Sequence, residues 1–470
     1  MNHRLAPPEA LPRLEADLIQ KMNVRGPRYT SYPPVPLWTS DFGAPDLEAA
    51  LSTAAQAGAK APLSLYIHVP FCKSLCTYCG CNVVVSRDRA RMDAYVDRVL
   101  VELDLLAERL GDRNTLSRIH WGGGTPTWLD DDQLKRLWYG IQSSFTLQKG
   151  AEIAVELHPG ITDIERLQRL RGLGFNRLSM GVQDFDPAVQ QAIGRVQSIS
   201  HTACLVSAAR ALGFESINFD LVYGLPAQTL KTWQHTLDVV ADMAPDRLAI
   251  YGFAYLPEQR ANQRKIDASQ LPTPATRVEL FTAAYGHFVE HGMVPIGMDH
   301  FARPDDELAV AQRARRLWRD FQGYTVKRAH DTIAVGATAI SDVGGAYAQN
   351  VSRLGVYGEH VDRGELPVAR GIKLTAEDQL RRQLITQIMC NFWVDLADFS
   401  PEGRDVATVH ARYAHELEAL EPLVADDLVD CEGTELSLTP RGRLFVRNLA
   451  MIFDPHLQTG RPQARYSRTI

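Results

Sequence analysis

A strand-like run, Leu63-Ser-Leu-Tyr-Ile-His-Val69, leads directly into a group of four cysteines in Phe71-Cys-Lys-Ser-Leu-Cys-Thr-Tyr-Cys-Gly-Cys81. The first three follow the spacing CxxxCxxC. Three thiolates this close together suit a cubane iron–sulfur cluster whose fourth iron has no protein ligand. The segment therefore predicts a metal site at the end of a strand.

Other uses of these cysteines stay open on spacing alone. Zinc sites usually divide their ligands into two pairs that lie far apart in sequence, which this segment does not do. A disulfide framework is disfavoured because only seven cysteines serve 470 residues, and Cys204, Cys390 and Cys431 are scattered. An iron–sulfur cluster is the favoured interpretation, with a zinc knot or another redox use as alternatives.

The composition is that of an ordinary globular chain. Its 470 residues are 45% hydrophobic and 23% charged, enough for a large core and a second, smaller domain. The opening Met1–Ala10 lacks an apolar h-region, and no stretch approaches the roughly eighteen apolar residues of a membrane span. The net charge of -6 provides no broad basic field for nucleic acid. We therefore expect a cytoplasmic protein whose compartment keeps thiols reduced.

Strand-like segments alternate with segments of helical periodicity, which is typical of βα units and a parallel sheet. The amphipathic segment from Asp88 to Leu110 is the first predicted helix. The predicted strands are Leu63–Val69, Leu116–Trp121, Glu152–Leu157, Arg177–Val182, Ile217–Tyr223 and Arg247–Phe253.

Almost every predicted strand ends in a polar or glycine-rich group. After the cysteines these are Gly122-Gly-Gly124, Glu156-Leu-His158, Gln183-Asp184, Asp220 and Tyr255. Polar residues can simply terminate strands. Because the carboxyl ends of parallel strands meet at one rim, however, their repetition favours a functional site there.

The pattern changes beyond about Leu374 to amphipathic helices, a strand candidate at Glu435–Leu438 and a final helix from about Thr439 to Phe453. We expect a docking arm in residues 1–60, an α/β domain in 61–373 and a helical, winged-helix-like domain in 374–470. A winged helix raises the question of DNA binding, but Glu421 to Pro440 has acidic residues and no Lys or Arg. We therefore expect a lid or a packing module.

Two sets of motifs place the chain more narrowly. Tyr66-Ile-His-Val-Pro-Phe-Cys72, the cysteine spacing and Gly122-Gly-Gly-Thr-Pro-Thr127 resemble the radical S-adenosylmethionine (SAM) superfamily. The narrower set comprises Arg25-Gly-Pro-Arg-Tyr-Thr-Ser-Tyr-Pro33, Cys81, Met180-Gly-Val-Gln-Asp-Phe185, Asp220-Leu-Val-Tyr-Gly-Leu-Pro226, Gly297-Met-Asp-His-Phe-Ala-Arg-Pro-Asp305 and Phe321-Gln-Gly-Tyr-Thr325. From about Arg25 to the C-terminus, this set resembles the oxygen-independent coproporphyrinogen III oxidase family.

The resemblance implies a partial (β/α) barrel of about six parallel strands, an N-terminal arm and a smaller, mostly helical C-terminal domain. It implies a haem-biosynthesis enzyme that uses a 5′-deoxyadenosyl radical to convert two propionates of coproporphyrinogen III to vinyl groups, forming protoporphyrinogen IX. The implied cofactors are a 4Fe–4S cluster and two SAM molecules. The implied partners are an unidentified electron donor and acceptor, and we expect a monomer that binds neither nucleic acid nor membrane.

Residue roles are carried over from the same resemblance. It assigns Cys72, Cys76 and Cys79 to the cluster. It places Tyr66, Gly123, Glu156 and Ile340 at the SAM on the cluster, and Tyr78, Gly124, Thr125, Gln183, Arg195, Asp220 and Ala254 at a second SAM. Tyr66, Cys81 and Glu156 are the expected catalytic residues. Arg25, Arg28 and Tyr29 are expected at the substrate, because arginines interleaved with tyrosines suit a flat ring that carries carboxylates.

Simpler roles and related activities stay open. Gly122–Gly124 lack a Cβ and would admit a bound methionine moiety, but they also suit a tight turn. Cys81 suits a buried small residue, and the Arg25 segment suits a docked arm. Where the family usually has Asp-Pro-Arg and His-Leu-Pro, this chain has His158-Pro-Gly160 and Tyr255-Leu-Pro257. The alternatives are a haem-acting radical SAM methyltransferase, a haem chaperone and, from another class, a zinc-stapled nucleic-acid-binding module.

Overall fold

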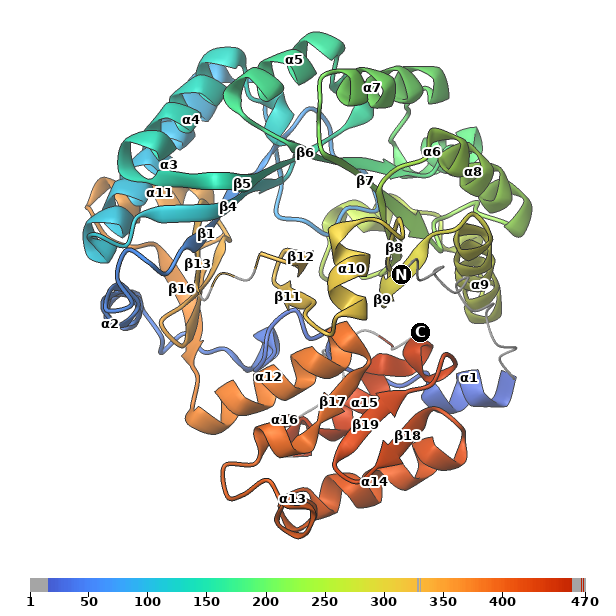
Figure 1. Ribbon diagram of the computed structural model, residues 1–470. Coiled ribbons are helices and arrows are strands. Elements are labelled where there is room, and N and C mark those ends of the chain that lie inside the picture. Colours follow the sequence, from blue (N-terminus) through green and yellow to red (C-terminus); the bar gives the residue numbers. More distant parts are fainter. Residues whose placement is uncertain (1–15, 328, 330, 459–465, 467, 469–470) are drawn as a thin grey trace, which may run out of the picture. The chain divides into compact units, whose positions relative to one another are not determined.

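A computed structural model describes residues 16–327, 329, 331–458, 466 and 468 (Figure 1). Met1–Ala10, used above to predict localisation, lies outside these residues. The chain divides into a barrel unit, Trp38–Leu280 with Ala329–Lys373, and a C-terminal unit, Met1–Leu37 with Phe281–Arg328 and Leu374–Ile470. The described residues 16–37 thus group with the C-terminal unit, whereas Trp38 begins the barrel unit. The functional division at residues 60 and 373 stays a prediction.

The barrel unit is built on a row of parallel strands. In order across the sheet they are β1 (Leu63–Val69), β4 (Thr115–Gly123), β5 (Thr146–Leu157), β6 (Arg177–Gln183), β7 (Ser216–Tyr223) and β8 (Arg247–Gly252). The helices of this unit are α2 (Ala44–Ala55), α3 (Arg89–Leu110), α4 (Asp131–Ser144), α5 (Ile164–Leu173), α6 (Pro187–Ile193), α7 (Ile199–Ala211), α8 (Leu230–Met243) and α11 (Leu354–Asp362). Figure 1 shows α3, α4, α5, α7 and α8 on the outer side of the curved row of strands, so the predicted partial barrel is confirmed.

Four further strands extend this sheet beyond β1, and the sequence patterns did not identify them. β13 (Asp331–Val335) pairs with β1 in parallel. β14 (Ile340–Val343), β15 (Ala346–Asn350) and β16 (Val368–Lys373) then follow as an antiparallel meander. Ile340, one of the expected SAM contacts, is the first residue of β14.

Side-chain caps determine where several helices begin. Asp88 accepts a hydrogen bond from the Arg91 amide at the start of α3, which confirms the predicted helix. Capping boxes begin α4 at Asp130 and α8 at Thr229. Such caps satisfy amides that the first helical turn leaves unpaired.

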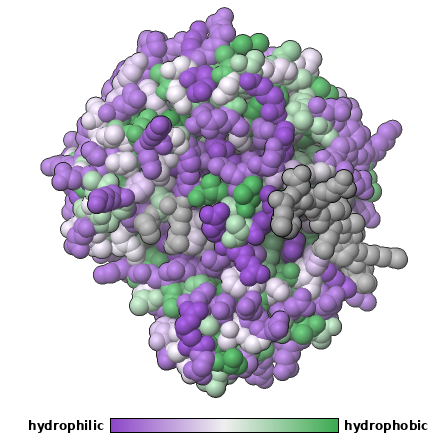
Figure 2. Space-filling model, in the orientation of Figure 1, coloured by the Kyte–Doolittle hydropathy of each residue, from purple (hydrophilic) through white to green (hydrophobic). Residues whose placement is uncertain are grey.

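The two faces of the barrel strands differ in chemistry because successive residues point to opposite sides. Residues such as Val155, Leu178 and Phe219 are fully buried or nearly so. On alternate positions, Glu152 forms buried ion pairs with Arg118 (3.1 Å) and Arg177 (3.0 Å). Burial alone would raise the pKa of Glu152, but the neighbouring arginines hold it at about 2. On the face shown in Figure 2, hydrophilic residues predominate and hydrophobic ones form small, separate patches.

The C-terminal unit combines helices with short antiparallel strands. Its helices are α1 (Ala16–Met22), α10 (Glu307–Arg313), α12 (Ala376–Asn391), α13 (Val406–Arg412), α14 (Ala414–Ala425), α15 (Val446–Ile452) and α16 (Pro455–Gln458), while α9 (Pro274–Glu290) spans the boundary between the units. Its strands are β9 (Val294–Gly297), β10 (His300–Ala302), β11 (Trp318–Asp320), β12 (Gly323–Thr325), β17 (Trp393–Asp395), β18 (Val429–Glu432) and β19 (Glu435–Leu438). β19 lies between β17 and β18, which confirms the strand candidate at 435–438. The predicted final helix is a 3-10 turn, Gly442–Phe445, followed by α15.

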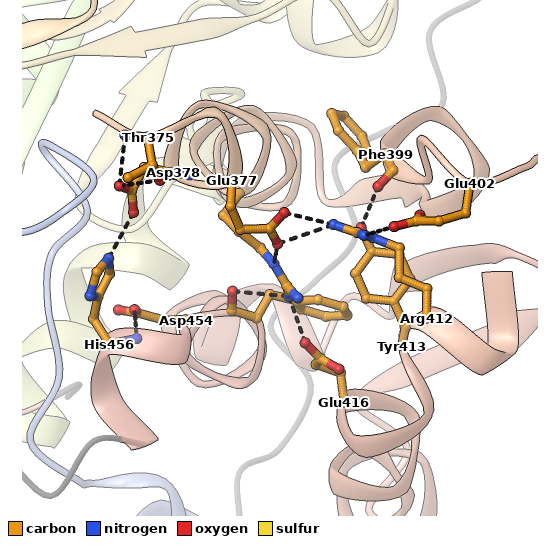
Figure 3. A network of polar contacts seen from close by, with 12 residues as sticks. Thr375, Glu377, Asp378, Phe399, Glu402, Arg412, Tyr413, Glu416, Asp454 and His456 are labelled. Atoms are coloured by element: carbon orange, nitrogen blue, oxygen red, sulfur yellow. Dashed lines mark hydrogen bonds and ion pairs between the residues drawn. The ribbon is translucent and has the colours of Figure 1, made fainter. Parts of the chain in front are cut away.

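A polar network holds the helices of this unit together (Figure 3). Arg381 donates to Glu377 (2.7 Å) and to Glu416 (2.6 Å), and Arg412 donates to Glu377 (2.8 Å) and Glu402 (2.5 Å). Both guanidinium groups also lie over the ring of Tyr413. The network therefore connects α12, α13 and α14 within one hydrogen-bonded group.

No helix in the described ranges is long and apolar enough to cross a membrane.

Candidate active site

The cysteine loop follows β1 and lies between β2 (Phe71–Cys72) and β3 (Val84–Val85). Cys76 is buried, Cys72 and Cys79 are half-buried, and Cys81 is exposed. All the cysteines of the chain lie in described positions, and all are free thiols. The three expected ligands are therefore available to a metal rather than committed to disulfides.

The protonation of these thiols depends on their immediate neighbours. Burial raises the pKa of Cys72 to about 11, although the Thr125 hydroxyl, 3.5 Å from its sulfur, opposes this shift. Burial also raises the pKa of Cys76, and Arg195 opposes it. A hydrogen bond with Cys81 lowers the pKa of Cys79 to about 6. A bound cation would favour the thiolate forms of Cys72 and Cys76, so this donor set fits an iron–sulfur cluster.

Within the described residues, no three His, Cys, Asp or Glu side chains come close enough together to hold a single metal ion. A cubane does not require such convergence, because each of its thiolates binds a different iron. The grouping of the sulfurs therefore does not decide between metals.

Arg195 lies beside the cysteine loop, two residues after α6 ends at Ile193. Its Nη1 lies 3.8 Å from the sulfur of Cys76, and its Nη2 donates to the carbonyl of Gly181. Its buried Nε has no hydrogen-bond partner among the residues that the structure describes. A buried guanidinium with an unused donor can bind a carboxylate at this point.

Gly122–Gly124 are packed against protein groups. A Cβ at Gly122 would lie 2.5 Å from Glu156 Oε1, and one at Gly124 would lie 2.7 Å from the carbonyl oxygen of Pro70. Gly123 has φ +112, and its Cβ would lie 2.5 Å from the His68 ring. Each of these glycines therefore lies too close to neighbouring protein atoms to accept a side chain, and a bound methionine moiety beside them stays a prediction.

Glu156 is oriented by two donors. Its Oε1 lies 3.0 Å from His120 Nε2, and its Oε2 accepts from the Gly123 amide at 3.1 Å. Burial alone would raise the pKa of Glu156, but the hydrogen bonds from His120 and Gly123 bring it below its ordinary value. The carboxylate is therefore kept ionised, as an acceptor of hydrogen bonds.

Tyr66 lies between two histidines. The Asn82 carbonyl can only accept, so His68 Nε2 (3.1 Å away) carries the proton, and His68 Nδ1 accepts from the Tyr66 hydroxyl at 3.2 Å. The Tyr66 ring stacks on His120, with centroids 5.9 Å apart. Sequence reasoning assigned no role to either histidine. The signals were present, because His68 is within the Tyr66–Cys72 motif and His120 is two residues before the glycines.

Asp220 is bound within the barrel by polar side chains of β6 and β7. Ser179 donates to Oδ2 and Asn218 donates to Oδ1, both at 2.9 Å. Burial and the nearby charge of Glu156 raise the pKa of Asp220 to about 6. At the end of β6, Gln183 has φ +67, a strained value for a residue other than glycine.

The remaining expected cofactor contacts occupy the same unit. Thr125 lies beside Cys72, and Ile340 starts β14 with 7% exposure. The carbonyls of Tyr78 and Ala254 accept from one side chain, Gln263. The barrel unit therefore contains every residue that the resemblance assigns to a cofactor.

The departure at His158 changes the charge beside Arg195. His158 Nδ1 accepts from the Gly160 amide at 3.0 Å. Burial, then the charges of Arg195 and Lys73, lower the pKa of His158 to about 3. This side chain is neutral near pH 7, whereas the aspartate usual in the family would bring a negative charge.

The three residues expected at the substrate belong to the C-terminal unit. Tyr29 is 8% exposed, and its hydroxyl donates to Asp454 at 3.0 Å. Arg28 forms an ion pair with Asp299, and the backbone of Arg25 forms an isolated antiparallel β-bridge with that of Arg468. These contacts match the docked arm left open above, and a role in binding substrate stays a prediction.

The similarity of this chain to known proteins extends over nearly its whole length. The family model of the Radical SAM superfamily matches residues 66–240, and that of the HemN C-terminal domain matches residues 374–445. Oxygen-independent coproporphyrinogen III oxidase of Escherichia coli (strain K12) is 42% identical over 454 residues, 96% of this chain and 98% of that protein. The Pseudomonas aeruginosa protein of the same name is 40% identical over 461 residues, 97% of this chain and 99% of that protein. A solved structure, coproporphyrinogen III oxidase (HemN) from Escherichia coli, matches with a TM-score of 0.89 and 40% identity, over 95% of this chain and all of that one.

Proposed function

Because the chain belongs to the oxygen-independent coproporphyrinogen III oxidase family of radical SAM enzymes, we propose that it converts two propionates of coproporphyrinogen III to vinyl groups in haem biosynthesis. The observation that carries this proposal is the match over nearly the full length of both chains. It includes the C-terminal domain and is not confined to the cysteine motif, which serves many reactions.

The cofactors are a 4Fe–4S cluster and SAM, with Cys72, Cys76 and Cys79 as the protein ligands. Their free thiols and their spacing support this ligand set. When bound, the reduced cluster and SAM supply a carbon-centred radical that removes a hydrogen atom from the propionate β-carbon. Each propionate also loses carbon dioxide and one electron, which an acceptor takes up, and a vinyl group is left.

The inward-facing residues of the barrel hold and orient these groups. Glu156, kept ionised by His120 and Gly123, accepts from hydroxyl or amino groups of the SAM on the cluster. Tyr66 lies against the same histidine, in one orientation set by His68. Their rigidity limits the radical to one C–H bond, because a misplaced substrate would be attacked elsewhere.

A second SAM lies near Gln183, Arg195 and Asp220. The unused Nε of Arg195 supports binding of its carboxylate, and Asp220 supports binding of its ribose. Arg25, Arg28 and Tyr29 form the substrate arm. The enzyme works as a cytoplasmic monomer with a separate electron donor and acceptor.

The function is tested by anaerobic incubation of the reconstituted protein with coproporphyrinogen III, SAM and a reductant, followed by mass analysis. The expected product has lost carbon dioxide and two hydrogens from each of two propionates. Methylated or ring-opened products formed only when haem is supplied would replace the proposal with the methyltransferase alternative. Cys76→Ser is expected to keep the fold and abolish SAM cleavage, and retained cleavage would refute the ligand assignment.

A further inference from the structure

Asn262 lies on a 3-10 helix, η4 (Ala261–Lys265), which follows β8. Its Nδ2 donates to the carbonyls of Cys76 (3.1 Å), Thr77 (3.0 Å) and Cys79 (2.9 Å). An amide nitrogen has two hydrogens, so at least one of them is shared between two of the three carbonyls. One side chain therefore binds three of the four backbone carbonyls in the segment from Cys76 to Cys79, which begins and ends with an expected cluster ligand.

Gln263, the next residue, completes the set. It is 1% exposed, and its Nε2 donates to the carbonyls of Tyr78 (2.9 Å) and Ala254 (3.1 Å). Its Oε1 accepts from the Leu256 amide at 2.6 Å. The carbonyls of the four consecutive residues from Cys76 to Cys79 thus all bind to Asn262 and Gln263, which we call the amide clasp.

The opposite side of the loop is anchored to the end of α6. The Thr77 amide donates to the Ile193 carbonyl at 3.0 Å, and the Thr77 hydroxyl donates to the Ala192 carbonyl at 3.2 Å. Arg195 follows two residues later. The loop is therefore held between one segment that carries Ala254 and another that carries Arg195, the two segments expected at the second SAM.

The loop needs these partners because it is irregular. Between β2 and β3 it forms turns and bends, so neither a helix nor a sheet ladder pairs its carbonyls. Polar backbone groups that are withdrawn from water require partners. Groups that hold metal ligands in place also influence how tightly the metal is retained.

We propose that Asn262 and Gln263 are positioning residues that hold the Cys76–Cys79 loop in the shape that binds the cluster and connect this loop to the second-SAM segment through Ala254. This inference rests on the proposed function, which assigns Cys76 and Cys79 to the cluster. We expect the clasp to act on retention of the cluster, because local opening of the loop would draw two of the three expected ligands away from the iron.

The test compares Asn262→Asp with a matched control, Asn176→Asp. The aspartate is nearly isosteric with asparagine, but it cannot donate and it places a negative charge among three carbonyl oxygens. Asn176 is also half-buried in the same unit, directly before β6, and it binds the Ala151 carbonyl and the Ile153 amide in the middle of β5. It therefore reports the cost of an Asn→Asp change away from the loop.

Each reconstituted protein is exposed anaerobically to an iron chelator, and iron release, the EPR spectrum of the reduced cluster and the thermal unfolding midpoint are measured. We expect Asn262→Asp to release iron about tenfold faster than the wild type, the factor that corresponds to the loss of one to two net hydrogen bonds. We also expect its EPR spectrum to change, whereas Asn176→Asp keeps the wild-type release rate and spectrum.

Gln263→Glu provides an independent measurement, and this variant tests the proposal if Asn262→Asp does not fold. It keeps the acceptor for Leu256 and loses the donor to Tyr78 and Ala254, so we expect faster iron release and weaker binding of one SAM. Wild-type release rates in the clasp variants would overturn the proposal. The proposal would also be overturned if Asn176→Asp released iron as fast as the clasp variants and if the release rates of all variants followed their thermal unfolding midpoints. A wild-type protein that takes up no cluster would instead refute the proposed function, before any variant is made.

Discussion

The guanidinium Nη1 of Arg195 lies 3.8 Å from the sulfur of Cys76. This contact joins a residue expected at the second SAM to a residue expected to bind the cluster. The cation favours the Cys76 thiolate against the effect of burial. Loading of the cluster and binding of the second SAM are therefore expected to depend on one side chain.

Replacing Arg195 with Met keeps much of its bulk and removes its charge. We expect the affinity for one of the two SAM molecules to fall by about thirtyfold, because a charge-assisted hydrogen bond is worth about 2 kcal/mol. Equilibrium dialysis with labelled SAM measures this effect. Arg169→Met is the control, because Arg169 is a surface residue paired with Asp131 and Glu165. Two SAM molecules bound with wild-type affinity would contradict the role given to Arg195.

His120→Phe keeps a ring to stack on Tyr66 and removes the hydrogen bond to Glu156. Without that donor, burial dominates and the pKa of Glu156 rises. We expect kcat to fall by about tenfold and its acidic limb to move to higher pH, which corresponds to about 1.4 kcal/mol of lost stabilisation. A pH profile of SAM cleavage measures both changes, and an unchanged profile would show that His120 has no effect on Glu156.

The pKa of Asp220, about 6, predicts a pH dependence for binding of SAM. Because burial and Glu156 raise this pKa, the carboxylate is present above about pH 6 and becomes protonated as the pH falls below it. Each pH unit below about 6 should then weaken binding of the second SAM by up to about tenfold. Calorimetric titration between about pH 5 and pH 8 tests this expectation. Asp220→Asn should bind weakly at every pH, and a surviving pH step in this variant would assign the titration to another group.

The polar network of the C-terminal unit predicts a stability difference between two of its glutamates (Figure 3). Glu416 and Arg381 are each 10% exposed, so Glu416→Gln leaves a buried guanidinium with one carboxylate fewer. We expect a loss of about 3 kcal/mol in the free energy of unfolding of this unit. The side chain of Glu402, which pairs with Arg412, is 53% exposed, so Glu402→Gln should lower the free energy of unfolding by less than about 1 kcal/mol. Urea unfolding followed by fluorescence compares them, and equal losses would contradict the assigned role of burial.

Local pattern predicted the parallel strands well because each one is followed by its own helix. It did not identify β13, because Asp331–Val335 pairs with β1 from a distant part of the chain. A five-residue segment such as Asp331-Thr-Ile-Ala-Val335 is too short for its periodicity to specify a partner strand. Ile340 was reached through the family resemblance rather than through recognition of its strand.

The sequence likewise predicted only those parts of the site whose residues lie close together in the chain. Residues adjacent in sequence, such as Cys72, Cys76 and Cys79, carry their chemistry in their spacing. His120 acquires its meaning only when β4 and β5 are paired and its ring reaches Glu156. Asn262 carries no motif, and only folding brings it onto the cysteine loop.

The sequence by itself determined the class of chemistry, because the spacing of the thiolates and the residues at the strand ends are local properties that can be read directly from the sequence. It also determined the alternation of strands and helices, since each element buries one face of its own. Only the tertiary structure decided which groups orient Glu156 and Tyr66, which protein atoms lie against the glycines and which side chains hold the cysteine loop. Those relationships depend on hydrogen bonds and close packing between segments far apart in sequence, whose geometry exists only once the sheet has formed.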